Sequence, residues 1–146
     1  MTDQDKHYEF GKAVNEQVID NSNIVLRTLL FINGGAAVAM LGFIGSIVGS
    51  EGAQQSSDIA GLTLPLIWFG WGIVAVVVAM VFAYFTNYAV VAHSFAMSEG
   101  KFDNATKLGT AKMALHCCAA LTTIGSLALF IFGLFEVRAS VMTLMG

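Results

Sequence analysis

Long uncharged, apolar segments alternate with short polar ones along the chain. Residues 28–50, 59–98 and 113–135 contain no Asp, Glu, Lys or Arg. Because about 20 apolar residues in a helix cross the roughly 30 Å hydrocarbon core of a bilayer, each segment is long enough to span it. The pattern therefore predicts an all-α membrane protein with three transmembrane helices.

The central uncharged segment is longer than one membrane crossing needs, and Pro65 indicates where its helix begins. A proline is accommodated in the first turn of a helix but disrupts its interior, so we expect the helix to begin near Thr63 or Leu64. Trp68 and Tyr88 then lie 20 residues apart. That is about 30 Å along a helix, which is the separation expected of two interfacial aromatic belts.

These boundaries divide a single transmembrane domain of residues 1–146 into seven segments. They are an N-terminal arm (1–27), a first span (28–49), an outer loop (50–62), a second span with an extension (63–93), a second loop (94–111), a third span (112–135) and a tail (136–146). Apolar residues recur in the arm mostly at fourfold spacing, which predicts an amphipathic helix. The turn-forming residues 20–23 leave two alternatives, a break in the arm or one continuous helix.

Basic residues are concentrated in alternate flanking segments. In chain order, these segments contain three, none, three and one Lys or Arg, when Lys112 at the edge of the third span is counted with the second loop. Since short cytoplasmic segments are enriched in Lys and Arg, we expect the N-terminus and the second loop in the cytoplasm and the C-terminus outside. The polar, acidic arm is unlike a cleavable signal or a transit peptide, which favours a multi-pass protein of a bacterial inner membrane.

Small residues form a regular stripe on each of the first two spans. In lipid, small residues that let helix backbones approach closely mark packing faces. The first stripe, at spacings of 4, 3, 4 and 3, comprises Gly35, Ala39, Gly42, Ser46 and Gly49. The second stripe comprises Gly72, Ala75, Ala79 and Ala83. Internal packing of both stripes is the plainer alternative, but three helices have little interior, so we expect the first stripe to join copies into a homo-oligomer.

Asn33 is the most notable polar residue within the spans. It has two interpretations: a hydrogen bond within the protein, or a ring of amides at the mouth of a pore if the first span lines the axis of an oligomer. Thr122, Thr123 and Ser126 are expected to bond to their own helix. Apart from Lys112 at the edge of the third span, the spans contain no acidic or basic residue, which argues against a pump or a proton-coupled transporter.

Four potential ligands lie toward one side of the second and third spans: His93, His116, Cys117 and Cys118. Two imidazoles on antiparallel helices would suit a haem, and with it a membrane anchor or accessory subunit of a larger, respiratory-type complex. Adjacent cysteines point about 100° apart on a helix, and no metal-binding spacing accompanies them. We therefore expect no cofactor, and two reduced cysteines packed as small apolar groups.

Charge and motif content limit the function classes. The net charge is −3 with no basic cluster, which excludes a nucleic-acid binder. All ten acidic residues lie in tails and loops, and no nucleophile, phosphate-binding or zinc motif is found, so we expect no enzyme. The expected partners are the lipid bilayer and a copy of the chain, with a channel or pore as one outcome.

The segment LRTLLFINGGAAVA, from Leu26 to Ala39, is followed by a second span that contains Trp and Tyr. This layout resembles small three-span proteins of bacterial inner membranes, a group without an assigned activity, so the resemblance implies the topology alone. In length and number of spans the chain is also similar to the membrane anchor subunits of succinate dehydrogenase. It departs from those anchors because no arginine lies near His93.

Overall fold

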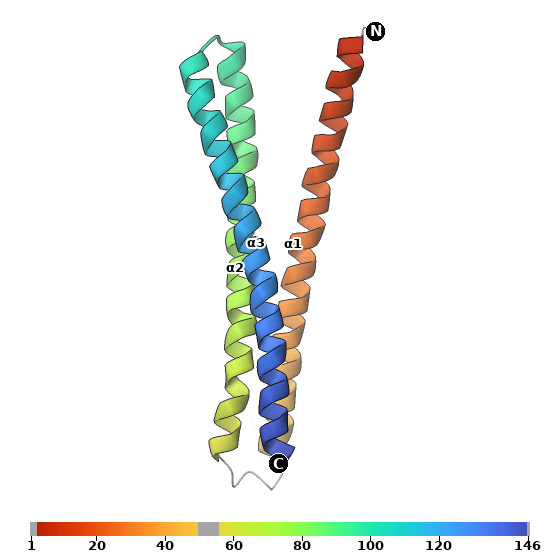
Figure 1. Ribbon diagram of the computed structural model, residues 1–146, viewed down its shortest axis with the longest axis vertical. Coiled ribbons are helices and arrows are strands. Elements are labelled where there is room, and N and C mark those ends of the chain that lie inside the picture. The colour runs from red at the N-terminus through yellow and green to blue at the C-terminus, as the bar shows by residue number, and fades with distance from the viewer. Residues whose placement is uncertain (1–2, 50–55, 146) are drawn as a thin grey trace.

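The computed structural model describes residues 3–49 and 56–145, which form three long helices (Figure 1). They are α1 (Asp3–Gly49), α2 (Ser56–Ser98) and α3 (Phe102–Met145). Each of them is long and apolar enough to cross a membrane. The prediction of an all-helical protein with three candidate transmembrane helices is therefore confirmed.

α2 and α3 form an antiparallel hairpin that is closed by a tight turn. The N–H groups of Gly100 and Lys101 donate hydrogen bonds to the carbonyl oxygens of Met97 and Ala96, at 3.2 and 2.9 Å. Gly100 has a φ of 72°, in the left-handed region that glycine adopts without strain at the end of a helix. The turn lies at the same end of the molecule as the N-terminus, and the C-terminus lies at the other end (Figure 1).

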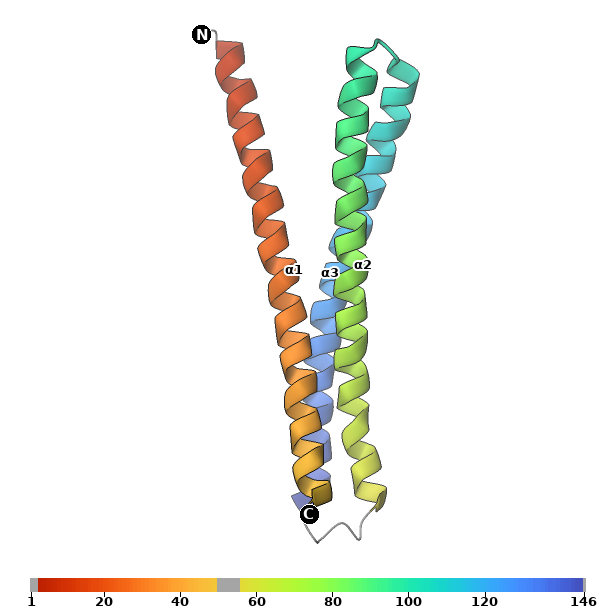
Figure 2. The same cartoon turned by 180° about the vertical axis from the view of Figure 1, so that it is seen from behind.

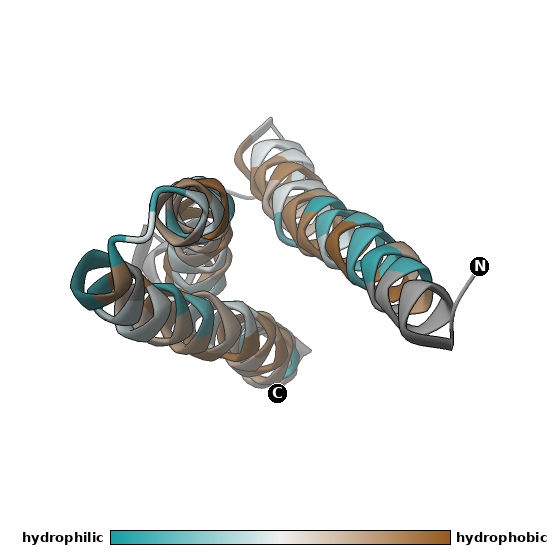
Figure 3. Cartoon of the chain, turned by 90° about the horizontal axis from the view of Figure 1, so that it is seen from above, coloured by the Kyte–Doolittle hydropathy of each residue, from teal (hydrophilic) through white to brown (hydrophobic). Residues whose placement is uncertain are grey.

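α1 packs on the hairpin along its C-terminal half and diverges from it toward the N-terminus (Figures 1 and 2). Its main contacts are with α2, and those with α3 are few. Between Glu9 and Val25 every side chain described is exposed, apart from a partly buried Ile19. Seen along the helices, this part of α1 carries both hydrophilic and hydrophobic residues (Figure 3). The N-terminal half of α1 is therefore a free-standing rod.

Of the two alternatives for residues 20–23, the continuous helix is the one formed. The hydroxyl of Ser22 donates to the carbonyl oxygen of Val18 at 2.8 Å, so it bonds to the preceding turn and does not cap a new helix. The 47 residues of α1 extend for about 70 Å, roughly twice the thickness of a hydrocarbon core.

The helix of the second span begins at Ser56, so the start expected from Pro65 is wrong. Pro65 is buried inside α2, and without an N–H it cannot donate to the carbonyl of Gly61, four residues earlier. The hydroxyl of Ser140 on α3 donates to that oxygen instead, at 3.2 Å. A neighbouring helix thus satisfies the freed acceptor, which is how membrane helices tolerate proline.

The loops and the tail are shorter than the charge pattern predicts. The connection between α2 and α3 is residues 99–101, and not 94–111. α3 continues through the expected tail, of which Gly146 lies outside the described residues, as do residues 50–55 of the expected outer loop. The reason is physical: charged residues mark where a helix leaves the bilayer, and a helix does not have to end there.

Candidate functional site

A buried polar cluster of Asn33, Gly72 and Ser126 joins the three helices at one level. The side-chain nitrogen of Asn33 donates to the carbonyl oxygen of Leu29 at 2.9 Å and to Oγ of Ser126 at 3.3 Å. The hydroxyl of Ser126 in turn donates to the carbonyl oxygen of Gly72 at 2.9 Å. Asn33 and Ser126 are both fully buried. One chain of hydrogen bonds therefore links α1, α3 and α2.

The missing side chain of Gly72 provides the space for this cluster. A Cβ atom at Gly72 would lie 2.6 Å from Cγ of Asn33 and would overlap Oδ1. The Cα hydrogen of Gly72 that occupies this direction points at Oδ1 of Asn33. That oxygen accepts no conventional hydrogen bond from the described residues. Cα–H···O contacts of this kind recur at close helix interfaces. Gly72 thus provides both the room and a weak donor for Asn33.

The polar cluster lies deep in the uncharged layer of the molecule. Along α3, Lys112 and Glu136 are 14 residues before and 10 residues after Ser126, or about 21 and 15 Å at the rise of a helix. Their combined separation matches a bilayer core with its boundary. Arg27 on α1 is exposed and about 9 Å above the level of Asn33, so its long side chain reaches toward the interface. In such a layer an unpaired polar group is costly.

Ser126 has a different role from the one expected. Thr122 and Thr123 bond to carbonyl oxygens of their own helix, as predicted, at 2.7–3.0 Å. Ser126 bonds across to α2 and accepts from α1. Whether a serine hydroxyl bonds within its own helix or to another helix depends on which residue faces it, and that cannot be inferred from the sequence.

The small-residue stripe of α2 packs inside the bundle. Gly72 and Ala79 are buried, and Ala79 belongs to a core with Val76, Leu26 and Leu29. The remaining members of the stripe, Ala75 and Ala83, are partly buried. For this stripe, the structure shows packing within the single chain.

The small-residue stripe of α1 is exposed along its whole length: Gly35, Ala39, Gly42, Ser46 and Gly49. A Cβ atom added at Gly35, Gly42 or Gly49 would meet nothing within 4 Å. At 3.6 residues per turn, Gly35 and Gly42 lie roughly 180° around α1 from Asn33. The stripe therefore points away from the bundle. If copies of the chain met along this stripe, Asn33 would not line the axis between them, because its side chain is a polar contact among the three helices.

A second close contact, between Phe69 and Gly133, could not be inferred from the sequence. Phe69 is buried, and a Cβ atom at Gly133 would lie 2.8 Å from Cδ1 of its ring. Trp68 packs on Phe132, with ring centroids 5.9 Å apart. Along α2, Trp68 is about 6 Å from Gly72, and its place in an interfacial belt stays a prediction. A single glycine that faces an aromatic ring on another helix produces no periodic pattern in the sequence from which the contact could be predicted.

The four potential ligands do not converge. His93 lies against Gly109 of α3, where a Cβ atom would be 3.7 Å from Cε1 of the imidazole. The exposed His116 is about 10 Å further along α3, whereas a bis-imidazole haem needs both rings on one iron. Cys117 and Cys118 are exposed and not buried as expected. Within the described residues, no three His, Cys, Asp or Glu side chains are arranged to hold a metal.

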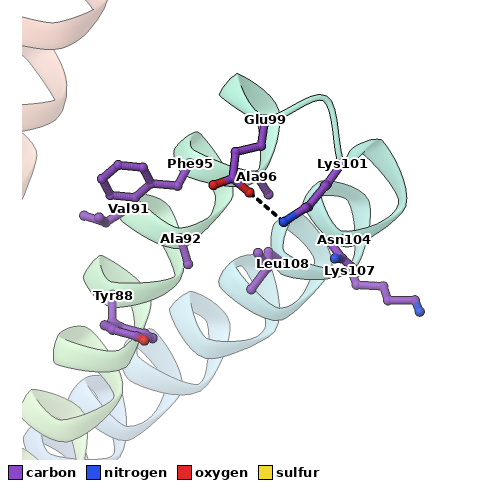
Figure 4. A pocket seen from close by; sticks show the side chains of 10 residues that line it. All are labelled: Tyr88, Val91, Ala92, Phe95, Ala96, Glu99, Lys101, Asn104, Lys107 and Leu108. Atoms are coloured by element: carbon purple, nitrogen blue, oxygen red, sulfur yellow. Dashed lines mark ion pairs between the residues drawn. The ribbon is translucent and has the colours of Figure 1, made fainter.

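An open groove of about 640 Å³ lies between α2 and α3 near their turn (Figure 4). Its lining combines apolar side chains such as Phe95 with an ion pair between Lys101 and Glu99, at 2.7 Å. Both charged side chains are more than half exposed, so the pair adds little to stability. No nucleophile with an adjacent base lines the groove.

No family model matches the sequence, and no curated protein or solved structure matches it. The geometry of the three helices is thus the basis for assigning a function.

Proposed function

We propose that the chain is a non-enzymatic, multi-pass membrane protein that acts through helix–helix association, and that it forms a homo-oligomer through the outer face of α1. One observation carries the proposal. The small-residue stripe of α1 is exposed on the side opposite the bundle, whereas the comparable stripe of α2 is used inside it.

An exposed row of small residues favours contact with another helix over contact with lipid. Gly35 and Gly42 have no neighbour within 4 Å of a Cβ position, so the fold of the single chain gives no reason for glycine there. Two helices that meet along such a row bring their backbones into van der Waals contact, which drives association in a bilayer. Because the same face is present on every copy, it is suited to a symmetric, self-complementary interface.

The position of Asn33 favours association over conduction. Its amide lies among α1, α2 and α3, so the proposed interface has no polar ring from this residue. The stripe of α1 itself contains a single hydroxyl, that of Ser46, which donates to the carbonyl oxygen of Phe43 at 2.7 Å. A water-filled path along this interface would lack polar groups to line it.

We place the N-terminus and the α2–α3 turn in the cytoplasm, with the protein in a bacterial inner membrane. The distribution of Lys and Arg supports this orientation because basic residues accumulate on the cytoplasmic side. The two segments richest in Lys and Arg also lie at the same end of the molecule (Figure 1).

Energy transfer between labelled copies in liposomes tests the interface. Gly42→Leu and Ala39→Leu place bulk on the stripe, and Ala120→Leu adds similar bulk at an exposed position of α3. We expect the two α1 variants to weaken self-association at least about tenfold, or roughly 1.4 kcal/mol, and the control to behave like the native protein.

Gly42 is exposed and a Cβ atom there would meet nothing within 4 Å, so a loss of energy transfer in Gly42→Leu would report on the contact between copies and not on misfolding. Equal energy transfer in the native protein and in both α1 variants would contradict the proposed interface.

A further inference from the structure

The free-standing part of α1 continues the register of its small-residue stripe. From Gly49 toward the N-terminus, the spacing of 3 and 4 residues passes through Gly35 and Thr28 and reaches Val25, Val18 and Val14. The eleven register positions are Val14, Val18, Asn21, Val25, Thr28, Ile32, Gly35, Ala39, Gly42, Ser46 and Gly49. All are exposed except Ile32, which is partly buried.

This register is that of a coiled coil, in which a seam of apolar or small residues repeats every 3.5 residues. It exists only because α1 is one helix: a break at residues 20–23 would have separated the arm from the span. We propose that the arms of two copies pair in parallel as a two-stranded coiled coil, outside the bilayer, along this seam. The inference rests on the proposed self-association and extends it to the aqueous part of α1.

The charges of the arm leave the seam open to a second copy of the chain. In a parallel pair each seam position faces its own equivalent, so a charge on the seam would face an identical charge. The five charged residues from Glu9 to Arg27 all lie off the seam: Glu9, Lys12, Glu16, Asp20 and Arg27. They occupy the positions that a coiled coil exposes to water.

The outer part of the arm has a face that is free to meet a partner. Val14, Val18 and Val25 are 41 to 49% exposed, and between Glu9 and Val25 only Ile19 is partly buried among the described side chains. Helices of this length that are rich in β-branched residues are marginal in water when they stand alone. The arm also continues the spanning part of α1 without a bend (Figure 2), so its direction is away from the membrane and not along its surface.

The spacing assigns the heptad positions of the seam. Val18 and Val25 lie at a positions and Asn21 lies between them at a d position, because the step from a to d is three residues and the step from d to a is four. β-branched residues at the positions of Val18 and Val25, which alternate with that of Asn21, favour two strands.

Cysteine crosslinking in proteoliposomes tests the pairing, in a background with Cys117→Ala and Cys118→Ala. Single cysteines replace Val14 or Val18 on the seam, with Lys12→Cys and Glu16→Cys as off-seam controls in the same arm. We expect the seam positions to form disulfide-linked dimers at least about tenfold faster than the controls, because only the seam brings equivalent residues together.

A fifth position, Gly42→Cys, separates failure of this inference from failure of the proposed function. Crosslinking at Gly42 without crosslinking at Val14 and Val18 would overturn the arm pairing and leave the membrane interface in place. An absence of crosslinks at all three positions would overturn both. Equal rates at seam and control positions, or seam cysteines shielded by lipid from an aqueous maleimide, would also overturn the arm pairing.

Two variants that each add one negative charge to the arm provide a second test of the pairing. Val18→Glu places like charges opposite one another on the seam, whereas Ala13→Glu adds the same charge off the seam. We expect the first to slow crosslinking at Val14→Cys at least about tenfold and the second to leave it unchanged. Unchanged crosslinking in both would contradict the pairing.

Discussion

The side chain of Asn33 on α1 occupies the space in which a side chain at Gly72 on α2 would stand. A Cβ atom at Gly72 would lie 2.6 Å from Cγ of Asn33, and Asn33 is fully buried. The amide nitrogen of Asn33 is bonded to Ser126 of α3. This relationship fixes how α1 sits on the hairpin, and therefore which face of α1 is left outside.

Gly72→Ala should destabilise the bundle. The added methyl group forces the amide of Asn33 out of its place, and overpacking of this kind costs about 1–3 kcal/mol. The free energy of unfolding in mixed detergent micelles measures the effect. Gly70→Ala on the same helix is the matched control, since a Cβ atom there meets no atom within 4 Å, and a loss of stability no larger than that of the control would refute this role of Gly72.

Ser126→Ala should weaken the bundle by about 0.6–1.7 kcal/mol, the range of hydrogen bonds between membrane helices. It removes both the donor to Gly72 and the acceptor for Asn33. Thr123→Val removes a hydroxyl that bonds only within α3, and its effect should be smaller. If the two variants lost the same stability in the same unfolding assay, the polar cluster would not be a link between helices.

Ser140→Ala should destabilise the end of the hairpin near Pro65 by about 0.5–1.5 kcal/mol. The carbonyl of Gly61 loses its donor, and Pro65 offers none in its place. In a Pro65→Ala background a backbone N–H is available at position 65, so Ser140→Ala should cost less there. A double-mutant cycle measures the difference, and strict additivity would show that the serine does not compensate for the proline.

Labelling of single cysteines tests the orientation, again with Cys117 and Cys118 replaced by Ala. An impermeant maleimide added outside intact bacterial cells should modify Thr143→Cys at least about tenfold more than Lys101→Cys, because the Lys-rich turn is expected in the cytoplasm. Permeabilised cells supply the control in which both positions react. The reverse preference in intact cells would invert the proposed topology.

The three helices could be predicted from the sequence because a bilayer imposes the length and composition of the parts that cross it. The helix ends could not, since α2 continues through Pro65 and the acceptor that this leaves at Gly61 is bonded by Ser140, a residue 75 positions from the proline. The spacing of Gly35 and Gly42 predicts a packing stripe, but the side of α1 that faces the bundle is the one that carries Asn33, Leu26 and Leu29. Periodicity shows which residues share a face, and tertiary contacts decide what that face meets.

The mass of the native protein released from lipid nanodiscs tests self-association through α1 most directly. Self-association through α1 predicts a discrete species whose mass is a whole multiple of the 15.5 kDa chain, and predicts that Gly42→Leu reduces it to a single chain. A native protein detected as one chain of 15.5 kDa, or as one chain bound to a haem or to a foreign subunit, would contradict self-association.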